Sequence, residues 1–197
     1  MAEPLPAPGP VEFRVPLFAA IVERMFDGDR WVVLDLGTSQ GRTVELLSQF
    51  RCRMDIADLP AVLDQIRSAD EETPLEPIVD AALPGRGDEP TDLVLCWDLL
   101  NYLEPRGMRA LMNCLVARSR PGTLMHGLII YTGTHMPARP GAYYPVMQDR
   151  LVNLPATLDE RRAPRYSPKA LEKYMQGFRA EKVRLLNNGM QEFLFRL

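Results

Sequence analysis

The apolar run at residues 31–36 constrains the fold of this chain more than any other part of the sequence. Asp35 is its only charged residue, and Gly37 follows it directly. A continuous apolar run of this length that ends at glycine is typical of a parallel strand buried on both faces of a sheet. Parallel strands need long crossover connections, which are usually helices. The run therefore predicts a sheet with helices packed on both of its faces.

Strands and helices alternate along the rest of the chain. Apolar spacing predicts helices at residues 17–26, 43–50, 59–66 and 108–116, and strands at residues 51–57, 77–82, 92–97 and 123–131. Such alternation indicates right-handed crossovers in a parallel sheet. Ser167 and Pro168 then begin another helix, and Asn188-Gly189 predicts a tight hairpin with positive φ at both positions. The expected fold class is α/β, with one doubly wound, mostly parallel sheet of about seven strands and a C-terminal antiparallel hairpin.

Composition narrows the class of protein. The chain has 197 residues, 46% of them apolar and 25% charged, which suits one water-soluble domain. A net charge of −3 supplies no basic surface for nucleic acid. The three cysteines lie apart in apolar segments, which favours buried thiols over disulfides or a metal site. Neither a membrane-spanning run nor a signal peptide is recognisable, so we expect a cytoplasmic protein without a membrane partner.

Two segments stand outside the alternation. Five of the 18 prolines fall in residues 1–16, which predicts a tail or strap before a domain at residues 17–197. Residues 134–166 show little periodicity and are too long for an idle connection, so they are interpreted as a lid or substrate wall. Surface padding or a dimer contact is the alternative. As a lid, its arginines Arg161, Arg162 and Arg165 would suit a carboxylate or phosphate on the substrate.

The residues after the first predicted strand carry the candidate chemistry. Residues 35–41, Asp-Leu-Gly-Thr-Ser-Gln-Gly, lie at a strand-to-helix junction, where a parallel sheet places its ligand crevice. Gly37 and Gly41 permit close backbone approach, although a turn without a ligand would also use them. Ser39 replaces the second glycine of a dinucleotide motif, and Asp35 favours an ammonium group over a phosphate. The pattern indicates a cofactor that carries an amino acid.

Asp58 follows Gly37 by 21 residues, at the end of the second strand. A carboxylate at this place can accept hydrogen bonds from both hydroxyls of a ribose. Asp58 could equally cap the helix that begins at Pro60. Asp55 is a competing acid, but it lies within the strand.

At these residues the chain resembles the class I S-adenosylmethionine-dependent methyltransferases, a superfamily with a Rossmann-like fold. The resemblance rests on residues 33–41, 58–60, 92–95 and 120–124 and spans residues 31–197. It implies that Asp35 and the turn hold the methionine end of the cofactor and that Asp58 holds the ribose. It further implies that Asp80 contacts the adenine and that Trp97 and Asp98 face the sulfonium. The implied cofactor-binding residues are Asp35, Gly37, Thr38, Ser39, Gly41, Asp58, Leu59, Asp80, Ala81 and Trp97.

The methyl acceptor is less defined. Residues 58–62 are similar to the small-molecule O-methyltransferases, whose general-base histidine is replaced here within residues 100–102. Methyl transfer is an in-line displacement in which positioning supplies much of the rate, so a base is optional. Asp98 and His135 are the catalytic candidates for a hydroxyl acceptor, with a helix N-cap and an exposed loop residue as the respective alternatives. His126 is expected to be remote from the site.

The sequence thus predicts a methyltransferase that uses S-adenosylmethionine and modifies an unidentified small molecule. The alternative is a catalytically silent methyltransferase-like domain that acts as a binding or scaffold partner, an interpretation favoured by Ser39 and by the missing histidine. A homodimer or a partner protein is compatible with either reading. A nicotinamide oxidoreductase fits less well because the glycine pattern differs.

Overall fold

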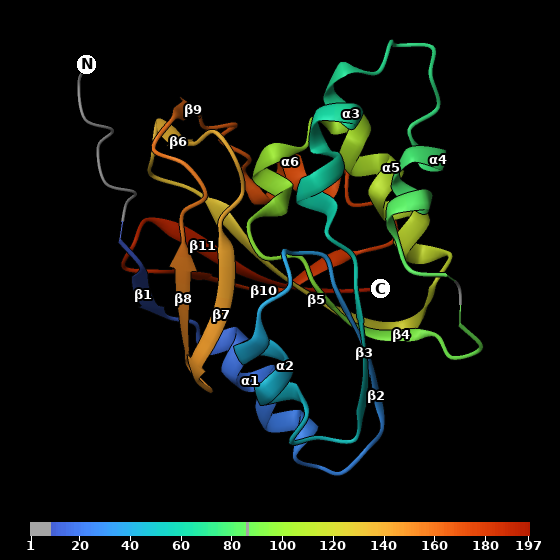
Figure 1. Ribbon diagram of the computed structural model, residues 1–197, viewed down its shortest axis with the longest axis vertical. Helices are drawn as coiled ribbons and strands as arrows, with labels where there is room; N and C mark the ends of the chain where they lie inside the picture. The colour runs from blue at the N-terminus through green and yellow to red at the C-terminus, as the bar shows by residue number, and fades with distance from the viewer. Residues whose placement is uncertain (1–8, 86) are drawn as a thin grey trace.

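A six-stranded sheet forms the centre of the computed structural model, which describes residues 9–85 and 87–197 (Figure 1). The strand order is β10-β11-β5-β4-β2-β3. The strands are β2 (Trp31–Asp35), β3 (Cys52–Ile56), β4 (Thr91–Leu95), β5 (Ser119–Ile130), β10 (Arg179–Leu185) and β11 (Met190–Arg196). Strands β3, β2, β4 and β5 run parallel, and β11 is antiparallel to β5 and β10. The α/β class and the terminal hairpin are confirmed.

Helices cover both faces of this sheet, as the alternation predicts. One face packs against α1 (Pro16–Met25) and α2 (Gly41–Leu47), and the other packs against α3 (Leu63–Ser68), α4 (Glu76–Ala82), α5 (Pro105–Val116) and α6 (Pro168–Glu172). The 3₁₀ turns η1 (Leu59–Val62) and η2 (Leu99–Tyr102) follow β3 and β4. Figure 1 shows α1 and α2 below the sheet and the other helices above it. Successive side chains of a strand point to opposite faces, so Val33 and Leu34 enter different cores.

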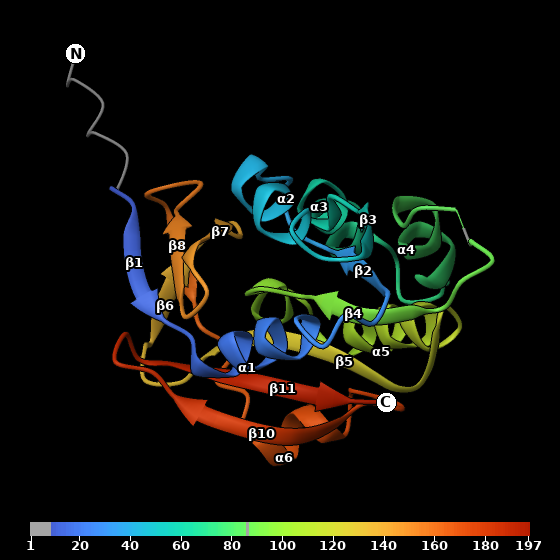
Figure 2. The same ribbon diagram turned by 90° about the horizontal axis from the view of Figure 1, so that it is seen from below.

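Two small antiparallel sheets lie at one end of the central sheet (Figure 2). Strands β1 (Val11–Arg14), β8 (Arg150–Leu154) and β7 (Ala142–Met147) pair in that order, and β6 (His135–Pro137) pairs with β9 (Glu160–Arg162). Residues 134–166, expected to form a long loop, therefore contain four short strands instead. In β7 burial alternates along the strand, but its sequence lacks an apolar–polar alternation and contains Pro145, which argues against a strand. Residues 11–16 also join the fold, through β1 and the first turn of α1, while residues 1–8 of the predicted tail lie outside the described residues.

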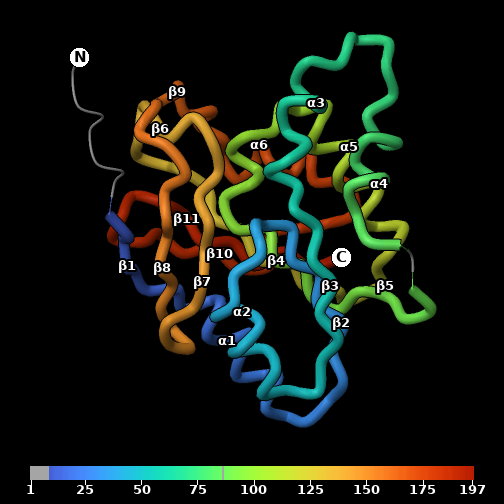
Figure 3. Tube along the Cα trace, viewed as in Figure 1, coloured from blue at the N-terminus to red at the C-terminus, as the bar shows by residue number. Residues whose placement is uncertain are grey.

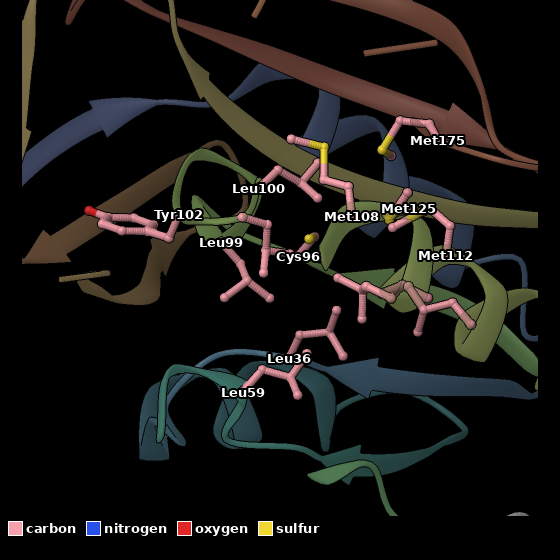
Figure 4. Close-up of a cluster of buried hydrophobic side chains, with 14 of the residues drawn as sticks. Leu36, Leu59, Cys96, Leu99, Leu100, Tyr102, Met108, Met112, Met125 and Met175 are labelled. Carbon is pink, nitrogen blue, oxygen red and sulfur yellow. The ribbon is translucent and has the colours of Figure 1, made fainter. Parts of the chain in front are cut away.

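The larger hydrophobic core packs against the turn between β2 and α2 through Leu36. Figure 4 shows Leu36 and Leu59 together on one side of this core, with Cys96 and Leu99 next to them and Met108 and Met112 of α5 beyond. The backbone N–H of Leu59 also donates to the carbonyl oxygen of Leu36 at 3.2 Å. This packing joins the start of η1 to the residue that precedes Gly37.

The seventh strand expected at residues 77–82 is instead helix α4. Pro77 lies in its first turn, where a missing N–H is tolerated, and Leu75, Val79 and Leu83 are buried at helical spacing. A short apolar run fits both a strand and a buried helix, and a four-residue spacing is compatible with either period. The central sheet consequently ends at β3.

The Asn188-Gly189 hairpin differs from the prediction in one dihedral angle. Gly189 has φ of 81°, whereas Asn188 is not among the described residues with positive φ. The Oδ1 atom of Asn188 accepts a hydrogen bond of 3.1 Å from the backbone N–H of Met190. This side-chain bond supports the turn without a left-handed asparagine.

No helix in residues 9–85 and 87–197 is both long and apolar enough to span a bilayer. In the same part of the chain, no group of three or more His, Cys, Asp or Glu side chains is arranged to hold a metal ion.

Candidate cofactor and acceptor site

The turn after β2 is shaped by the close approach of a tryptophan. A Cβ atom added to Gly37 would lie 2.5 Å from the Cδ1 atom of Trp97, far inside a normal contact. The same addition at Gly41 would meet no atom within 4 Å. Gly37 is therefore required because the Trp97 ring packs directly on its backbone, whereas Gly41 leaves open space at the start of α2.

Asp35 is buried beneath this turn and accepts two hydrogen bonds on one carboxylate oxygen. The backbone N–H of Gly37 donates to Oδ1 at 2.9 Å, and the Nε1–H of Trp97 donates to it at 2.6 Å. Burial raises the pKa of the Asp35 carboxyl to about 6, and the hydrogen bonds from Gly37 and Trp97 act against this rise. An ionised carboxylate here would gain from a cationic partner, such as the ammonium group of an amino acid.

Asp58 and Thr38 lie together on the exposed side of the same turn. The hydroxyl of Thr38 donates to the Oδ1 atom of Asp58 at 3.2 Å. Asp58 occupies the residue before η1, but its side chain makes no capping hydrogen bond. The structure thus brings Asp58 and the glycine-containing turn together at the carboxyl ends of β2 and β3, with the Asp58 carboxylate open to solvent and Leu59 buried beneath it.

Asp98, which follows β4, is buried and hydrogen-bonded to Tyr143, a residue that was not predicted at the site. The hydroxyl of Tyr143 donates to the Oδ2 atom of Asp98 at 3.1 Å. Burial raises the pKa of the Asp98 carboxyl to about 7, and hydrogen bonds from Tyr143 and the backbone of Gly141 act against the rise. Asp98 precedes η2 without capping it. Its partner is a side chain 45 positions away.

Trp97 joins the two carboxylates into one cluster. Its indole ring stacks on Tyr143 with 5.9 Å between centroids and 6° between planes, while its N–H binds Asp35. The Trp97 backbone has φ of 47°, in the left-handed region that non-glycine residues rarely adopt. Strain of this kind persists only where surrounding contacts impose it, and it gathers at functional sites.

Strand β7 covers this cluster from the side of α2. Figure 3 shows β7 passing beside α2, and the two elements are in contact. The guanidinium of Arg42, in the first turn of α2, lies 5.3 Å from the ring centroid of Tyr144. Tyr143 therefore points inward to Trp97 and Asp98 while Tyr144 contacts α2. Residues 142–147, Ala-Tyr-Tyr-Pro-Val-Met, do not alternate in polarity, so the sequence carried no signal that placed Tyr143 in the site.

His126 lies against the site, so the prediction that it is remote is wrong. Its ring centroid is 6.1 Å from that of Trp97, and its Nε2 atom is 2.9 Å from the Oε1 atom of buried Glu192. Glu192 also accepts hydrogen bonds from the backbone N–H groups of Leu17 and Phe18 at the start of α1. The cause is an irregularity in β5 that aligns His126 with Leu95, the last residue of β4.

Two other predicted site residues lie apart from the cluster. Asp80 is on α4, and its carboxylate is 3.1 Å from the guanidinium of Arg118, at the end of the sheet where β4 and β5 begin. Asp80 and Ala81, which the resemblance placed at the adenine, thus lie on α4 instead of on a strand that ends beside the turn after β2. A cavity of 220 Å³ lined by Arg53, Asp55 and Arg118 lies near that opposite end.

His135 is exposed on β6, in register with Arg162 of β9. Its Nδ1 atom is 3.1 Å from the hydroxyl of Thr134, and no contact described for it reaches Asp98 or Trp97. Of the two catalytic candidates, the structure brings only Asp98 into the cluster with the cofactor candidates.

Comparison with known proteins assigns the chain to a family. A family model described as "Methyltransferase domain" matches residues 11–183. No curated protein sequence matches the chain. Among solved structures, the chain is similar to the 1,6-didemethyltoxoflavin-N1-methyltransferase of Burkholderia thailandensis with bound S-adenosylhomocysteine, at 18% identity and a TM-score of 0.51, over 91% of this chain and 76% of that one.

Two further structures show the same fold. The N-methyltransferase NodS of Bradyrhizobium japonicum WM9, in complex with S-adenosylhomocysteine, is 12% identical with a TM-score of 0.50, over 92% of this chain and 86% of that one. An S-adenosylmethionine-dependent methyltransferase of Clostridium acetobutylicum ATCC 824 is 13% identical with a TM-score of 0.51, over 91% and 90% of the two chains. At these identities the likeness establishes the fold, and the sequence-based recognition of the superfamily is confirmed.

Proposed function

Because the chain belongs to the methyltransferase-domain family, we propose that it binds S-adenosylmethionine and transfers the methyl group to a small-molecule acceptor. One observation carries this proposal: the carboxylates of Asp35 and Asp58 flank a single turn at the carboxyl ends of two neighbouring parallel strands. This edge of a parallel sheet is where such folds bind their ligands.

The residues at the turn fit the two polar ends of the cofactor. The carboxylate of Asp58 is exposed next to the Thr38 hydroxyl, so it can accept hydrogen bonds from both hydroxyls of a ribose. Asp35 supplies a buried carboxylate for the ammonium group of the methionine end. The Trp97 ring, which packs on Gly37, would face the sulfonium and attract it through cation–π interaction. S-adenosylmethionine supplies a methyl group bound to positively charged sulfur, which a nucleophile can take without a metal.

Asp98 is the proposed proton acceptor. It is adjacent to Trp97, and the raised pKa of its carboxyl, about 7, suits proton transfer near neutral pH. His135 remains a second candidate only if the segment that carries β6 moves toward Asp98. Cys52, Cys96 and Cys114 are reduced cysteines, which fits the reducing cytoplasm as the place of the reaction.

A second candidate function follows from the donors that the site already contains. Trp97 donates to Asp35 and Tyr143 donates to Asp98, so both carboxylates are engaged by the chain itself. This engagement would suit a silent methyltransferase-like domain that binds a partner protein. A silent domain would show no catalysis even where it retains affinity for the cofactor.

Formation of S-adenosylhomocysteine separates the two functions. The protein is incubated with S-adenosylmethionine and a panel of phenols, alcohols, amines and thiols, and the demethylated cofactor is quantified by mass spectrometry. A methyltransferase converts at least one acceptor class, and Asp98→Asn lowers that rate by about 10²-fold or more. Cofactor binding without turnover across the whole panel would support the silent domain instead.

A further inference from the structure

Tyr143 occupies the position at which an acceptor would meet the proposed base. We infer that the methyl acceptor is a planar aromatic molecule with a ring hydroxyl, and that the phenol of Tyr143 holds its place between Trp97 and Asp98 until it binds. This inference rests on the proposed function, because it assigns the acceptor of that same site.

The stacking of Tyr143 indicates a flat binding slot. The Tyr143 and Trp97 rings are within 6° of parallel, with 5.9 Å between centroids, which is an offset stack. Both side chains are almost fully buried, at 3% and 2% exposure. A second aromatic ring could take the same face of Trp97, whereas an aliphatic group would lose the ring–ring contact.

The hydrogen bond of Tyr143 indicates the polar group of the acceptor. Its hydroxyl donates to Asp98 at 3.1 Å, in a place where Asp98 is only 5% exposed. A molecule that displaced Tyr143 without donating a hydrogen bond would leave the buried carboxylate without this partner, which is unfavourable. A phenol replaces both the ring that stacks on Trp97 and the hydroxyl that donates to Asp98. An aryl ether replaces only the stacked ring, and an aliphatic alcohol replaces only the hydrogen-bond donor.

The strand that carries Tyr143 lies at the edge of its sheet. β7 is an outer strand of its sheet; within residues 9–85 and 87–197 it pairs with β8 alone, and the pairing is irregular between Pro145 and Met147. An edge strand held on one side opens at a lower free energy than a central strand. Its neighbour Tyr144 rests on Arg42, an exposed side chain that can follow the motion.

Methyl transfer to a phenol requires three groups: the acceptor hydroxyl, the methyl group on the cofactor sulfur and the Asp98 carboxylate. The acceptor O–H proton passes to the Asp98 carboxylate while the acceptor oxygen attacks the methyl carbon. The bond between that carbon and sulfur breaks, and its electron pair stays on the sulfur. The products are an aryl methyl ether, S-adenosylhomocysteine and a protonated Asp98, which returns its proton to solvent.

Tryptophan fluorescence tests this inference directly. In a Trp31→Phe background, Trp97 is the remaining tryptophan, because the chain contains two. The protein is titrated with 4-methylphenol, 4-methylanisole and cyclohexanol, both with and without saturating S-adenosylhomocysteine. We expect 4-methylphenol to change the Trp97 emission and to bind about tenfold or more tightly than either other probe. Equal binding of the three probes, or 4-methylphenol binding that leaves the emission unchanged, would overturn the inference.

Two variants of neighbouring tyrosines sharpen the test. Tyr143→Phe keeps the ring but removes the donor to Asp98, so we expect 4-methylphenol to displace it more easily and bind more tightly than in the parent. Tyr144→Phe removes a hydroxyl from the same strand and should leave the affinity within about twofold. An identical effect of both substitutions would contradict a specific role for Tyr143.

The inference and the proposed function can fail separately. Calorimetric titration with S-adenosylmethionine measures cofactor binding alone, so its failure removes the proposed function whatever the phenol titration shows. If the cofactor binds and aliphatic acceptors are methylated as fast as phenols, the proposed function stands and the aromatic acceptor is wrong.

Discussion

The indole N–H of Trp97 donates a hydrogen bond of 2.6 Å to the Oδ1 atom of Asp35, across 62 positions of sequence. This bond ties the end of β4 to the end of β2 at the turn proposed to bind the cofactor. Its loss should affect both stability and the ionisation of Asp35.

Trp97→Phe should destabilise the fold by about 1–3 kcal/mol, because a buried carboxylate loses a donor and the smaller phenyl ring leaves a gap at a buried position. The pKa of the Asp35 carboxyl should rise further, since the Trp97 hydrogen bond lowers it. Urea unfolding measures the first effect and NMR titration of the carboxyl carbon measures the second. Trp31→Phe is the matched control. An unchanged Asp35 pKa in Trp97→Phe would show that the bond is absent in solution.

Two glycines of the same turn should respond differently to alanine. Gly37→Ala places a methyl group against the Trp97 ring and should destabilise the fold by about 1–3 kcal/mol. Gly41→Ala meets open space at the first residue of α2 and should be neutral or stabilising by up to about 1 kcal/mol. Thermal unfolding of the pair measures the difference. Equal changes would mean that Trp97 does not pack on Gly37.

Stability should fall as the pH rises through the weakly acidic range. Burial raises the pKa of Asp98 to about 7 and that of Asp35 to about 6, above the ordinary value of 3.8 that an unfolded chain would have. Between these values the unfolded state releases protons that the folded state keeps, so raising the pH favours unfolding. The contribution is complete below about pH 4 and is lost by about pH 7.

Asp98→Asn removes the larger of these two effects and should flatten the dependence of unfolding free energy on pH between about pH 4 and 7. Urea unfolding at intervals across this range measures the slope. The matched control is Asp27→Ala, which changes an exposed carboxyl. A slope equal to that of the parent would place the Asp98 titration outside this range.

Glu192 should anchor the amino end of α1. Its buried carboxylate accepts hydrogen bonds of 3.0 Å from Leu17 N–H and 2.8 Å from Phe18 N–H, besides facing His126. Glu192→Leu removes these acceptors and should destabilise the fold by about 2–4 kcal/mol. Hydrogen exchange should accelerate more in α1 than in α5. The exposed Glu12→Leu serves as control, and uniform acceleration across both helices would argue against a local anchor.

Local patterns were sufficient to predict the turn and its carboxylates. The apolar run before Gly37 predicted β2, and the spacing to Asp58 predicted that the two would meet, because parallel strands end at one edge. The identity of α4 was ambiguous, since its apolar residues are few and fit either period. Recognition of the strand–helix order therefore survived one wrong element.

The sequence could not predict contacts between residues that are far apart in the chain. Tyr143 reaches Asp98 only because β7 folds back across α2, and His126 reaches Trp97 only because β5 is irregular. Neither the fold-back nor the change of register has a local sequence signature strong enough to predict it. The acceptor side of the site was for this reason the part that the sequence described least.

Calorimetric titration with S-adenosylmethionine tests directly whether the protein binds this cofactor through Asp58. The parent protein is compared with Asp58→Ala, and Asp27→Ala is the matched control. Asp58 is exposed, so its replacement should leave the fold intact while removing the acceptor for the ribose hydroxyls. We predict saturable binding by the parent and by Asp27→Ala, and binding weakened about tenfold or more in Asp58→Ala. No heat of binding in the parent would show that the protein does not bind S-adenosylmethionine, and equal affinity in all three proteins would show that Asp58 does not hold it.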